Sequence, residues 1–259
     1  MTALPASNWL MEWPEGTGAE RILLCCHHAG GGAAQFREWQ TVLGPGTAVL
    51  ALQLPGRQNR WDEAPVQTME EVLAEAVPAL LERLTLPYVV FGHSMGGAIG
   101  FELGRRLGSE HNLWPTRLIL SAAPPPHRRE EIPDLSDVRD ADLIKFFVDS
   151  GAIPSWVLED PDLQSLLVPP LRGDLAIGKQ YEYAPGPPVP CALSVCGGIE
   201  DSALTPLLEG WRHYTSGDFQ LMTFQGGHMF YLDPASDLLP AVKRLIEAPA
   251  CALAGQEGV

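Results

Sequence analysis

The sequence predicts an α/β fold in which a mostly parallel central sheet is covered by helices on both faces. Short apolar runs alternate along the chain with segments of helical periodicity, which is the pattern of α/β domains. Most of these runs are apolar at every position, as expected for strands that are buried on both faces of a parallel sheet. A single α/β domain commonly reaches 259 residues, so we expect residues 1–259 to form one domain.

The expected strands are the apolar runs at residues 21–26, 48–52, 88–91, 117–121, 192–196 and 219–224. Helices are expected between them. In residues 68–84, Thr68 stands at the N-cap position and Glu71 follows three residues later, which is a capping-box pattern. A second helix should begin just after Ser94 and run through Leu107. A third should span residues 234–247, with a proline in its first turn.

Residues 124–190 interrupt this alternation. The region contains no good strand pattern, and prolines are concentrated at both of its ends. Residues 141–149 and 162–167 are amphipathic pieces that indicate helices. We therefore expect an inserted helical lid over an active site at residues 124–190. The alternative is a helical excursion that packs on the domain and does not move.

Charge and composition narrow the choice of partners. The formal net charge of −15 argues against binding to nucleic acid or to an anionic membrane. No apolar stretch of about 18 residues is free of charges, so no membrane-spanning helix is expected. Residues 1–16 show neither the basic nor the apolar part of a signal peptide, so we expect a cytoplasmic protein. Residues 249–259 should form a disordered tail.

The cysteine pattern indicates neither disulfides nor a metal site. The count of 5 is odd and no C-x-x-C pair occurs. Cys25 and Cys26 are adjacent in an expected strand, where neighbouring side chains point to opposite faces. We therefore expect buried free thiols in a reducing compartment.

The segment Gly92-His93-Ser94-Met95-Gly96 matches the pattern G-x-S-x-G. It lies between an expected strand and an expected helix, which is the setting that a nucleophile elbow requires. The flanking glycines allow the strand and the helix to approach closely, and the helix N-terminus favours negative charge at the site. The pattern therefore predicts Ser94 as the nucleophile of a serine hydrolase.

A serine hydroxyl needs an adjacent base, and in this class of fold the acid and then the histidine follow the serine along the chain. His228 follows the last expected strand on a glycine loop, whereas His213 lies in a helix-like stretch and is expected on the surface. We predict His228 as the base. Asp201, on the loop after the preceding strand, is the preferred orienting acid. Its neighbour Glu200 remains an alternative.

Acyl transfer also needs backbone N–H donors for the developing oxyanion. The run His27-His28-Ala29-Gly30-Gly31-Gly32 follows the first strong strand, where hydrolases of this kind place one such donor. The second donor is the residue after the nucleophile. The predicted donors are therefore the N–H groups of Ala29 and Met95. A phosphate-binding loop is disfavoured because the glycine spacing fits neither of the common nucleotide-binding patterns.

Several motifs together resemble the type II thioesterases, the free-standing editing enzymes of polyketide and nonribosomal peptide assembly lines. The resemblance covers roughly residues 20–247, and one departure is that Cys26 and His27 stand where the family often has an aromatic residue and a proline. The segments that carry it are HHAGGGAAQFREW (27–39), LQLPGRQNRWDEAP (52–65), VFGHSMGG (90–97), LLVPPLRGDLAIGKQYEY (166–183), GGIED (197–201) and GGHMFY (226–231).

The resemblance implies an α/β-hydrolase fold and the hydrolysis of acyl thioesters carried on the phosphopantetheine arm of acyl or peptidyl carrier proteins. Stalled or misprimed short acyl groups would be the substrates. It implies Ser94, Asp201 and His228 as the triad, Ala29 and Met95 as oxyanion donors, no metal and no cofactor. We expect a monomer. A carboxylester hydrolase or lipase acting on free esters is the alternative, and a non-catalytic binding module is a third.

Two sets of side chains are candidates for substrate contacts. Basic side chains could meet the phosphate of the arm or an acidic carrier, although each is expected to be an ordinary solvated cation; they are Arg57, Arg60, Arg105, Arg106, Arg172 and Lys179. Apolar side chains of the expected lid could shape an acyl chamber or form the core of the lid; they are Phe146, Phe147, Ile153, Trp156 and Leu158.

Overall fold

The computed structural model describes residues 8–131, 134–135 and 137–248. Its central sheet has seven strands in the order β1-β3-β2-β4-β5-β6-β7. β1 pairs with β3 in the antiparallel direction, and all other neighbours are parallel. The strands are β1 (Leu10–Glu12), β2 (Arg21–Cys26), β3 (Thr47–Leu52), β4 (Tyr88–His93), β5 (Arg117–Ser121), β6 (Ala192–Gly198) and β7 (Phe219–Phe224).

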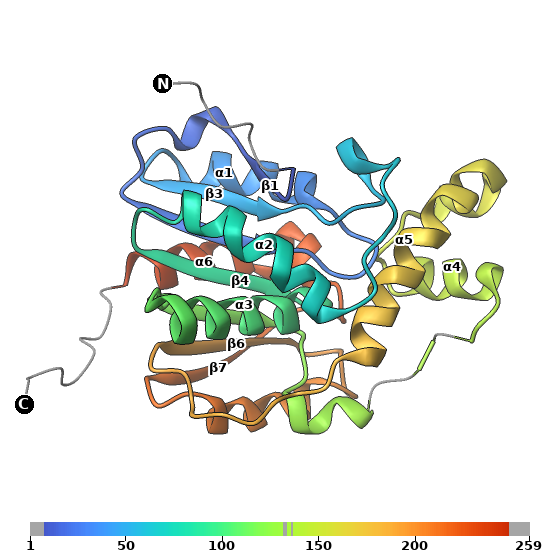
Figure 1. The fold of residues 1–259 in the computed structure, drawn as a ribbon. Helices are drawn as coiled ribbons and strands as arrows, with labels where there is room; N and C mark the ends of the chain where they lie inside the picture. The colour runs from blue at the N-terminus through green and yellow to red at the C-terminus, as the bar shows by residue number, and fades with distance from the viewer. Residues whose placement is uncertain (1–7, 132–133, 136, 249–259) are drawn as a thin grey trace, which may run out of the picture.

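Helices cover both faces of this sheet (Figure 1). α2 and α3 lie on one face, and α1 and α6 lie on the other. α4 and α5 lie beyond the carboxyl ends of the strands. The helices are α1 (Arg37–Leu43), α2 (Met69–Arg83), α3 (Met95–His111), α4 (Asp140–Asp149), α5 (Pro161–Gln180) and α6 (Leu238–Glu247). None of the described helices is both long and apolar enough to cross a bilayer.

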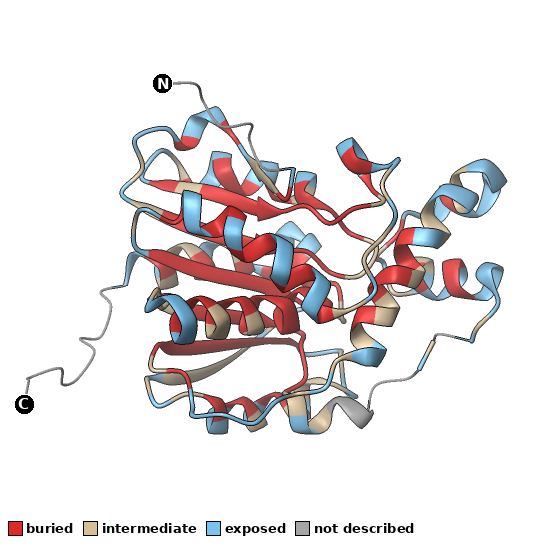
Figure 2. Cartoon of the chain, in the orientation of Figure 1, coloured by how far each residue is buried: buried red, intermediate tan, exposed pale blue. Residues whose placement is uncertain are grey.

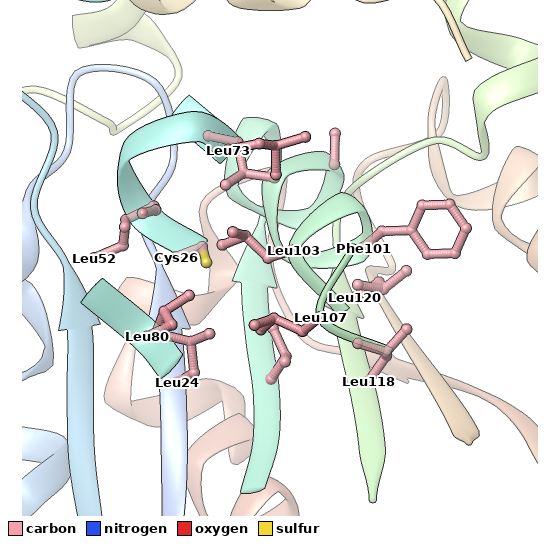
Figure 3. Close-up of a cluster of buried hydrophobic side chains, with 14 of the residues drawn as sticks. Leu24, Cys26, Leu52, Leu73, Leu80, Phe101, Leu103, Leu107, Leu118 and Leu120 are labelled. Atoms are coloured by element: carbon pink, nitrogen blue, oxygen red, sulfur yellow. The ribbon is translucent and has the colours of Figure 1, made fainter. Parts of the chain in front are cut away.

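The core consists of two layers, one on each side of the sheet (Figure 2). Leu24 and Cys26 of β2 face Leu73 of α2 and Leu103 of α3 (Figure 3). Their neighbours in β2 point to the opposite layer, which α1 and α6 complete. This alternation is the geometry of an extended strand. It explains why β2 is apolar at nearly every position and why parallel strands of this kind were recognisable in the sequence.

The four cysteines in the described residues are buried and free, which confirms the prediction of free thiols for them; they are Cys25, Cys26, Cys191 and Cys196. Burial raises the pKa of the Cys26, Cys191 and Cys196 thiols to about 12. These thiols therefore stay protonated and inert as nucleophiles near neutral pH. Cys251 and the expected tail lie outside the described residues.

The expected α/β architecture is confirmed, but β1 and the last helix differ from the prediction. β1 was not predicted, because three residues at a sheet edge leave too short a pattern. The helix expected at 234–247 is two pieces, a 3₁₀ turn (Pro234–Ser236) and α6, because Asp237 adopts a left-handed φ of 59°. The capping box at Thr68 and Glu71 is present at the start of α2 as predicted.

The chain between β5 and β6 forms an insertion of helices. It contains a 3₁₀ helix η4 (Pro126–Glu131), α4, a 3₁₀ helix η5 (Ser155–Glu159) and α5. Side chains of α4, η5 and α5 form a small hydrophobic cluster of their own, which includes Leu143, Phe147 and Val157. α5 is much longer than the expected piece at 162–167, because the helix continues through Pro169 and Pro170.

Candidate active site

Ser94 lies in the sharp turn between β4 and α3, with φ 55° and ψ −117°. Few residues other than glycine adopt a positive φ, and such strain is typical of functional sites. A Cβ at Gly92 would lie 2.0 Å from the carbonyl oxygen of Gly96, and one at Gly96 would lie 2.2 Å from that of Cys26. Glycine is therefore required on both sides of Ser94, which explains the G-x-S-x-G pattern.

The structure brings together three side chains that follow three different strands. His228, after β7, has its Nε2 3.1 Å from Ser94 Oγ and its Nδ1 2.7 Å from Asp201 Oδ2. A carboxylate only accepts hydrogen bonds, so Nδ1 carries the proton and Nε2 is left to accept the hydroxyl proton of Ser94. The arrangement therefore has the geometry needed to deprotonate a serine hydroxyl.

The alternatives left open by the sequence are separated by this geometry. Asp201 contacts His228 and is mostly buried, with 12% of its side chain exposed. Its position is held by a hydrogen bond from its own N–H to the carbonyl oxygen of Gly198. Glu200 is exposed, and so is His213 in the 3₁₀ helix η6 (Thr205–Tyr214).

Ala29 lies in a tight turn after β2, in which the N–H of Gly31 donates to the carbonyl oxygen of His28 at 3.0 Å. Gly30 has a φ of 79°, as the third position of a type II turn requires. Met95 is the first residue of α3, so its N–H points out of the helix N-terminus. Ala29 and Met95 line the same cavity as Ser94.

This cavity has a volume of about 600 Å³. One wall carries Ser94, Asp201 and His228, and the opposite wall comes from the insertion. Its surface is mainly apolar, as is typical of small-molecule sites. The chain between β5 and β6 contributes Ala122, Pro124, Asp134, Leu135, Phe146, Phe147, Ser150, Ala152, Asp174, Leu175, Gly178, Lys179 and Tyr181. Among residues 8–131, 134–135 and 137–248, no group of His, Cys, Asp or Glu could hold a metal ion.

Comparison with known proteins gives a consistent result. The family model described as "Thioesterase domain" matches residues 21–248. The chain belongs to the thioesterase family. The structure is similar to that of the type II thioesterase BorB from the borrelidin biosynthetic cluster, with 31% identity, a TM-score of 0.83 and coverage of 92% of this chain and 97% of BorB.

Two further proteins are similar over most of their length. RedJ, a thioesterase from the prodiginine biosynthetic pathway in Streptomyces coelicolor, is 33% identical, with a TM-score of 0.81 and coverage of 88% of this chain and 86% of RedJ. "Linear gramicidin dehydrogenase LgrE" from Brevibacillus parabrevis is 32% identical over 95% of both chains. Although that relative is named a dehydrogenase, the glycine run Gly30–Gly32 of the present chain lacks the G-x-G-x-x-G spacing typical of dinucleotide-binding loops.

The departure from the family pattern at Cys26 and His27 is accommodated inside the thioesterase. Cys26 is fully buried in the core layer under α3. His27 is also buried, and its Nδ1–H donates to the carbonyl oxygen of His28 at 2.8 Å. Burial is the main cause that lowers the pKa of His27 to about 4 and that of His28 to about 3. Both histidines are therefore neutral at physiological pH.

The basic candidates are ion-paired rather than free. Arg57 and Arg60 were expected to be solvated or to meet substrate, and this was wrong, because both are buried and paired with Asp174 and Glu63 respectively. Lys179 lines the cavity and lies 3.1 Å from the carboxylate of Asp134. The remaining three form ion pairs: Arg105 with Glu102, Arg106 with Glu70 and Glu110, and Arg172 with Asp140.

The apolar candidates of the insertion have different positions. Phe146 and Phe147 line the cavity. Ile153 is buried in the insertion's own cluster. Trp156 and Leu158 are exposed on η5 and do not line the cavity.

The sequence did not identify two groups beside the site. Asp174 on α5 is completely buried and bonds the turn that contains Ala29. Tyr231, after His228, bonds the ring of His28 and stacks on the ring of His93, with centroids 4.1 Å apart. For Asp174, the only signal in the sequence was an aspartate within an amphipathic helical pattern. A charge on the exposed face of a helix produces the same pattern, so the sequence could not identify Asp174 as buried.

Proposed function

We propose that this thioesterase hydrolyses acyl groups carried as thioesters on the phosphopantetheine arm of carrier proteins in polyketide or nonribosomal peptide synthesis. Aberrant or stalled short acyl groups are the proposed substrates. The main observation behind this proposal is the hydrogen-bonded triad of Ser94, His228 and Asp201 at the wall of an apolar cavity, in a chain of the thioesterase family. Its similarity to thioesterases of such biosynthetic pathways supports the assignment.

In the proposed acylation step, His228 Nε2 takes the proton of the Ser94 hydroxyl while Oγ attacks the thioester carbonyl carbon. The N–H groups of Ala29 and Met95 stabilise the negative charge on the carbonyl oxygen. The C–S bond then breaks, the pantetheine sulfur leaves with the proton from His228, and the acyl group stays on Ser94 as an ester. A thiolate is a good leaving group, so this step needs little help from a general acid.

In the proposed deacylation step, His228 accepts a proton from water, and the resulting hydroxide attacks the acyl-Ser94 ester. The ester bond breaks, Ser94 Oγ recovers its proton from His228, and a carboxylic acid is released. Asp201 holds the imidazole and stabilises its charged form in both steps. The proposed steps use side chains, two backbone N–H groups and water, and no step calls for a metal or a cofactor.

The insertion has a proposed role as a lid. Phe146 and Phe147 and the side of α5 that carries Leu175 form the roof of the cavity, so the acyl chain would lie beneath them. The thin pantetheine arm needs only a narrow opening. Lys179 at the cavity wall is the basic side chain best placed for the phosphate of the arm. We also propose a monomeric enzyme acting in the cytoplasm, in keeping with its buried free thiols.

The experiment that tests this function compares one acyl group on three leaving groups: a carrier protein, free pantetheine and nitrophenol. We expect kcat/KM to be about tenfold or more higher on the carrier than on pantetheine, because contacts remote from the reacting bond are used in the transition state. A carboxylester hydrolase would be favoured if kcat/KM on the nitrophenyl ester equals or exceeds that on the carrier thioester, and if the carrier gives no gain over pantetheine.

Covalent labelling separates an enzyme from a binding module. A fluorophosphonate probe should label the wild type and leave Ser94→Ala unlabelled, since only an activated serine reacts. Absence of labelling in the folded wild type would contradict the catalytic assignment.

A further inference from the structure

The turn that contains Ala29 is hydrogen-bonded at four successive peptide groups, from the one after His28 to the one after Gly31. The carbonyl oxygen of His28 accepts the ring N–H of His27 at 2.8 Å and the N–H of Gly31 at 3.0 Å. In a trans peptide the N–H points away from the carbonyl oxygen of the same unit. Fixing the oxygen of His28 therefore fixes the direction of the Ala29 N–H.

The next peptide group is held by α5. The N–H of Gly30 donates to Asp174 Oδ2 at 2.7 Å. Asp174 lies in the helix of the insertion, and its side chain is fully buried. This carboxylate is 144 residues from Gly30 along the chain, so the turn depends on the position of a distant element.

Arg57 completes the arrangement. Its guanidinium group forms two bonds of 2.7 Å with the two oxygens of Asp174 and donates a third, at 3.1 Å, to the carbonyl oxygen of Gly31. A fourth bond runs from Nε to the carbonyl oxygen of Pro55. The side chain of Arg57 is only 8% exposed. The carboxylate and the guanidinium group are therefore hydrogen-bonded to each other, and their remaining bonds go to backbone groups of Gly30, Gly31 and Pro55.

Close packing allows α5 to reach the turn. A Cβ at Gly30 would lie 2.7 Å from Leu171 Cδ2, and one at Gly173 would lie 2.7 Å from Pro65 Cβ. Glycine at both positions therefore lets the helix approach near enough for Asp174 to accept the N–H of Gly30.

A buried ion pair is a poor device for stability alone, because an apolar pair of similar volume often does as well or better. It does specify geometry, since a carboxylate and a guanidinium group have fixed donor and acceptor directions. We propose that Asp174 and Arg57 are positioning residues that hold the oxyanion turn in its productive geometry and couple it to α5. This inference rests on the proposed function, because it takes the Ala29 N–H as an oxyanion donor.

Three variants test the pair. Asp174→Asn keeps the shape but leaves the charge of Arg57 buried without its partner. The double change Arg57→Gln with Asp174→Asn removes both charges, so no unpaired charge remains. Glu63→Gln is the matched control, because it breaks the ion pair of another buried arginine, Arg60, whose partner does not line the cavity.

The measurements are kcat and KM for one acyl-pantetheine thioester, thermal stability, and the affinities of two inhibitors. A trifluoromethyl ketone with the same acyl chain forms a tetrahedral adduct with an oxyanion, whereas the corresponding acyl amide binds as an unreacted ground state. Loss of a whole oxyanion donor costs about 10²–10³-fold in kcat, so misplacing one should cost about 10–100-fold.

We expect kcat and the affinity for the ketone to fall together in Asp174→Asn, with KM and the affinity for the amide little changed. The double variant should recover thermal stability relative to Asp174→Asn and still have the low kcat. Glu63→Gln should keep the kcat of the wild type. A double variant that recovers both stability and kcat would overturn the inference, as would an Asp174→Asn variant that loses stability but keeps its kcat. Failure of the proposed function would appear differently, as a wild type that hydrolyses no thioester.

Discussion

The two halves of α5 belong to one helix but are packed in different ways. Residues 161–169 contain no buried position, and their apolar side chains contact the small cluster shared with α4 and η5. Residues 170–177 include five buried positions. Leu171 still belongs to that cluster, but this half also packs on the turn that contains Ala29 and on the chain near Pro65. Figure 2 shows the change from an exposed to a buried surface along the helix.

Two prolines stand where the halves join. Pro169 and Pro170 lack the N–H groups that would bond to the carbonyl oxygens of Ser165 and Leu166, so two backbone hydrogen bonds are missing in the middle of the helix. The backbone bonding of α5 is therefore weakest where the halves meet, although Leu171 of the second half still shares the cluster of α4 and η5. The second half of α5 is thus packed against the turn that contains Ala29 and the chain near Pro65, whereas the first half packs within the insertion.

The largest effect should come from the residues on the sheet side of the cavity. Ser94→Ala and His228→Ala should each lower kcat by about 10⁵–10⁶-fold, and the double variant should lose little more, because the groups act as a unit. Steady-state rates on one acyl-carrier substrate measure this. Multiplicative losses in the double variant would show that the two residues act independently.

The next effect separates the two neighbouring carboxylates. Asp201→Asn should lower kcat by about 10⁴-fold, because the imidazole loses the partner that sets its tautomer. Glu200→Gln, on an exposed side chain, is the matched control and should keep the rate of the wild type. A larger loss from the Glu200 change would refute the assignment of the acid.

Within α5, one pair of variants tests the comparison directly. Leu171→Ala should lower the free energy of unfolding by about 2–5 kcal/mol, because Leu171 is fully buried against Gly30. Leu166→Ala, on a side chain that is 61% exposed, should change it by less than about 0.5 kcal/mol. Urea denaturation gives both values. Equal losses would mean that the two halves are held alike.

A smaller effect concerns pH. The pKa of His27, lowered by burial and then by Arg57 from 6.5 to about 4, lies below its value in the unfolded chain. Between these values only the unfolded chain takes up the proton at this position, so His27 alone should lower stability by about 3 kcal/mol as pH decreases from 6.5 to 4. His27→Gln should reduce this slope of unfolding free energy against pH. An unchanged slope would show that His27 is not the group responsible.

Much of the sheet could be predicted because parallel strands buried on both faces are apolar throughout. The elbow at Ser94 was recognisable for a related reason, since only glycine fits beside it. The order of motifs then indicated His228. By contrast, adjacent carboxylates such as Glu200 and Asp201 differ only in which one the folded loop turns toward the histidine, and this direction is absent from the pattern.

The pair of Arg57 and Asp174 could not be predicted for a different reason. The two residues are 117 positions apart, and each carries a charge that usually lies on the surface. The expected helical piece ended at residue 167, and proline inside a helix usually breaks or kinks it, yet α5 continues through Pro169 and Pro170. Local preferences would place Arg57 and Asp174 on the surface and end the helix at the prolines. Contacts between residues far apart in the sequence give the opposite result in both cases.

The most direct test of the central assignment is rapid-quench mass spectrometry of the thioesterase mixed with an acyl-carrier thioester. The proposed mechanism predicts that the acyl group appears, within the first turnover, as an ester on the peptide that contains Ser94, and that Ser94→Ala neither acquires it nor turns over. An acyl group on a different residue, or undiminished turnover by Ser94→Ala, would contradict the account.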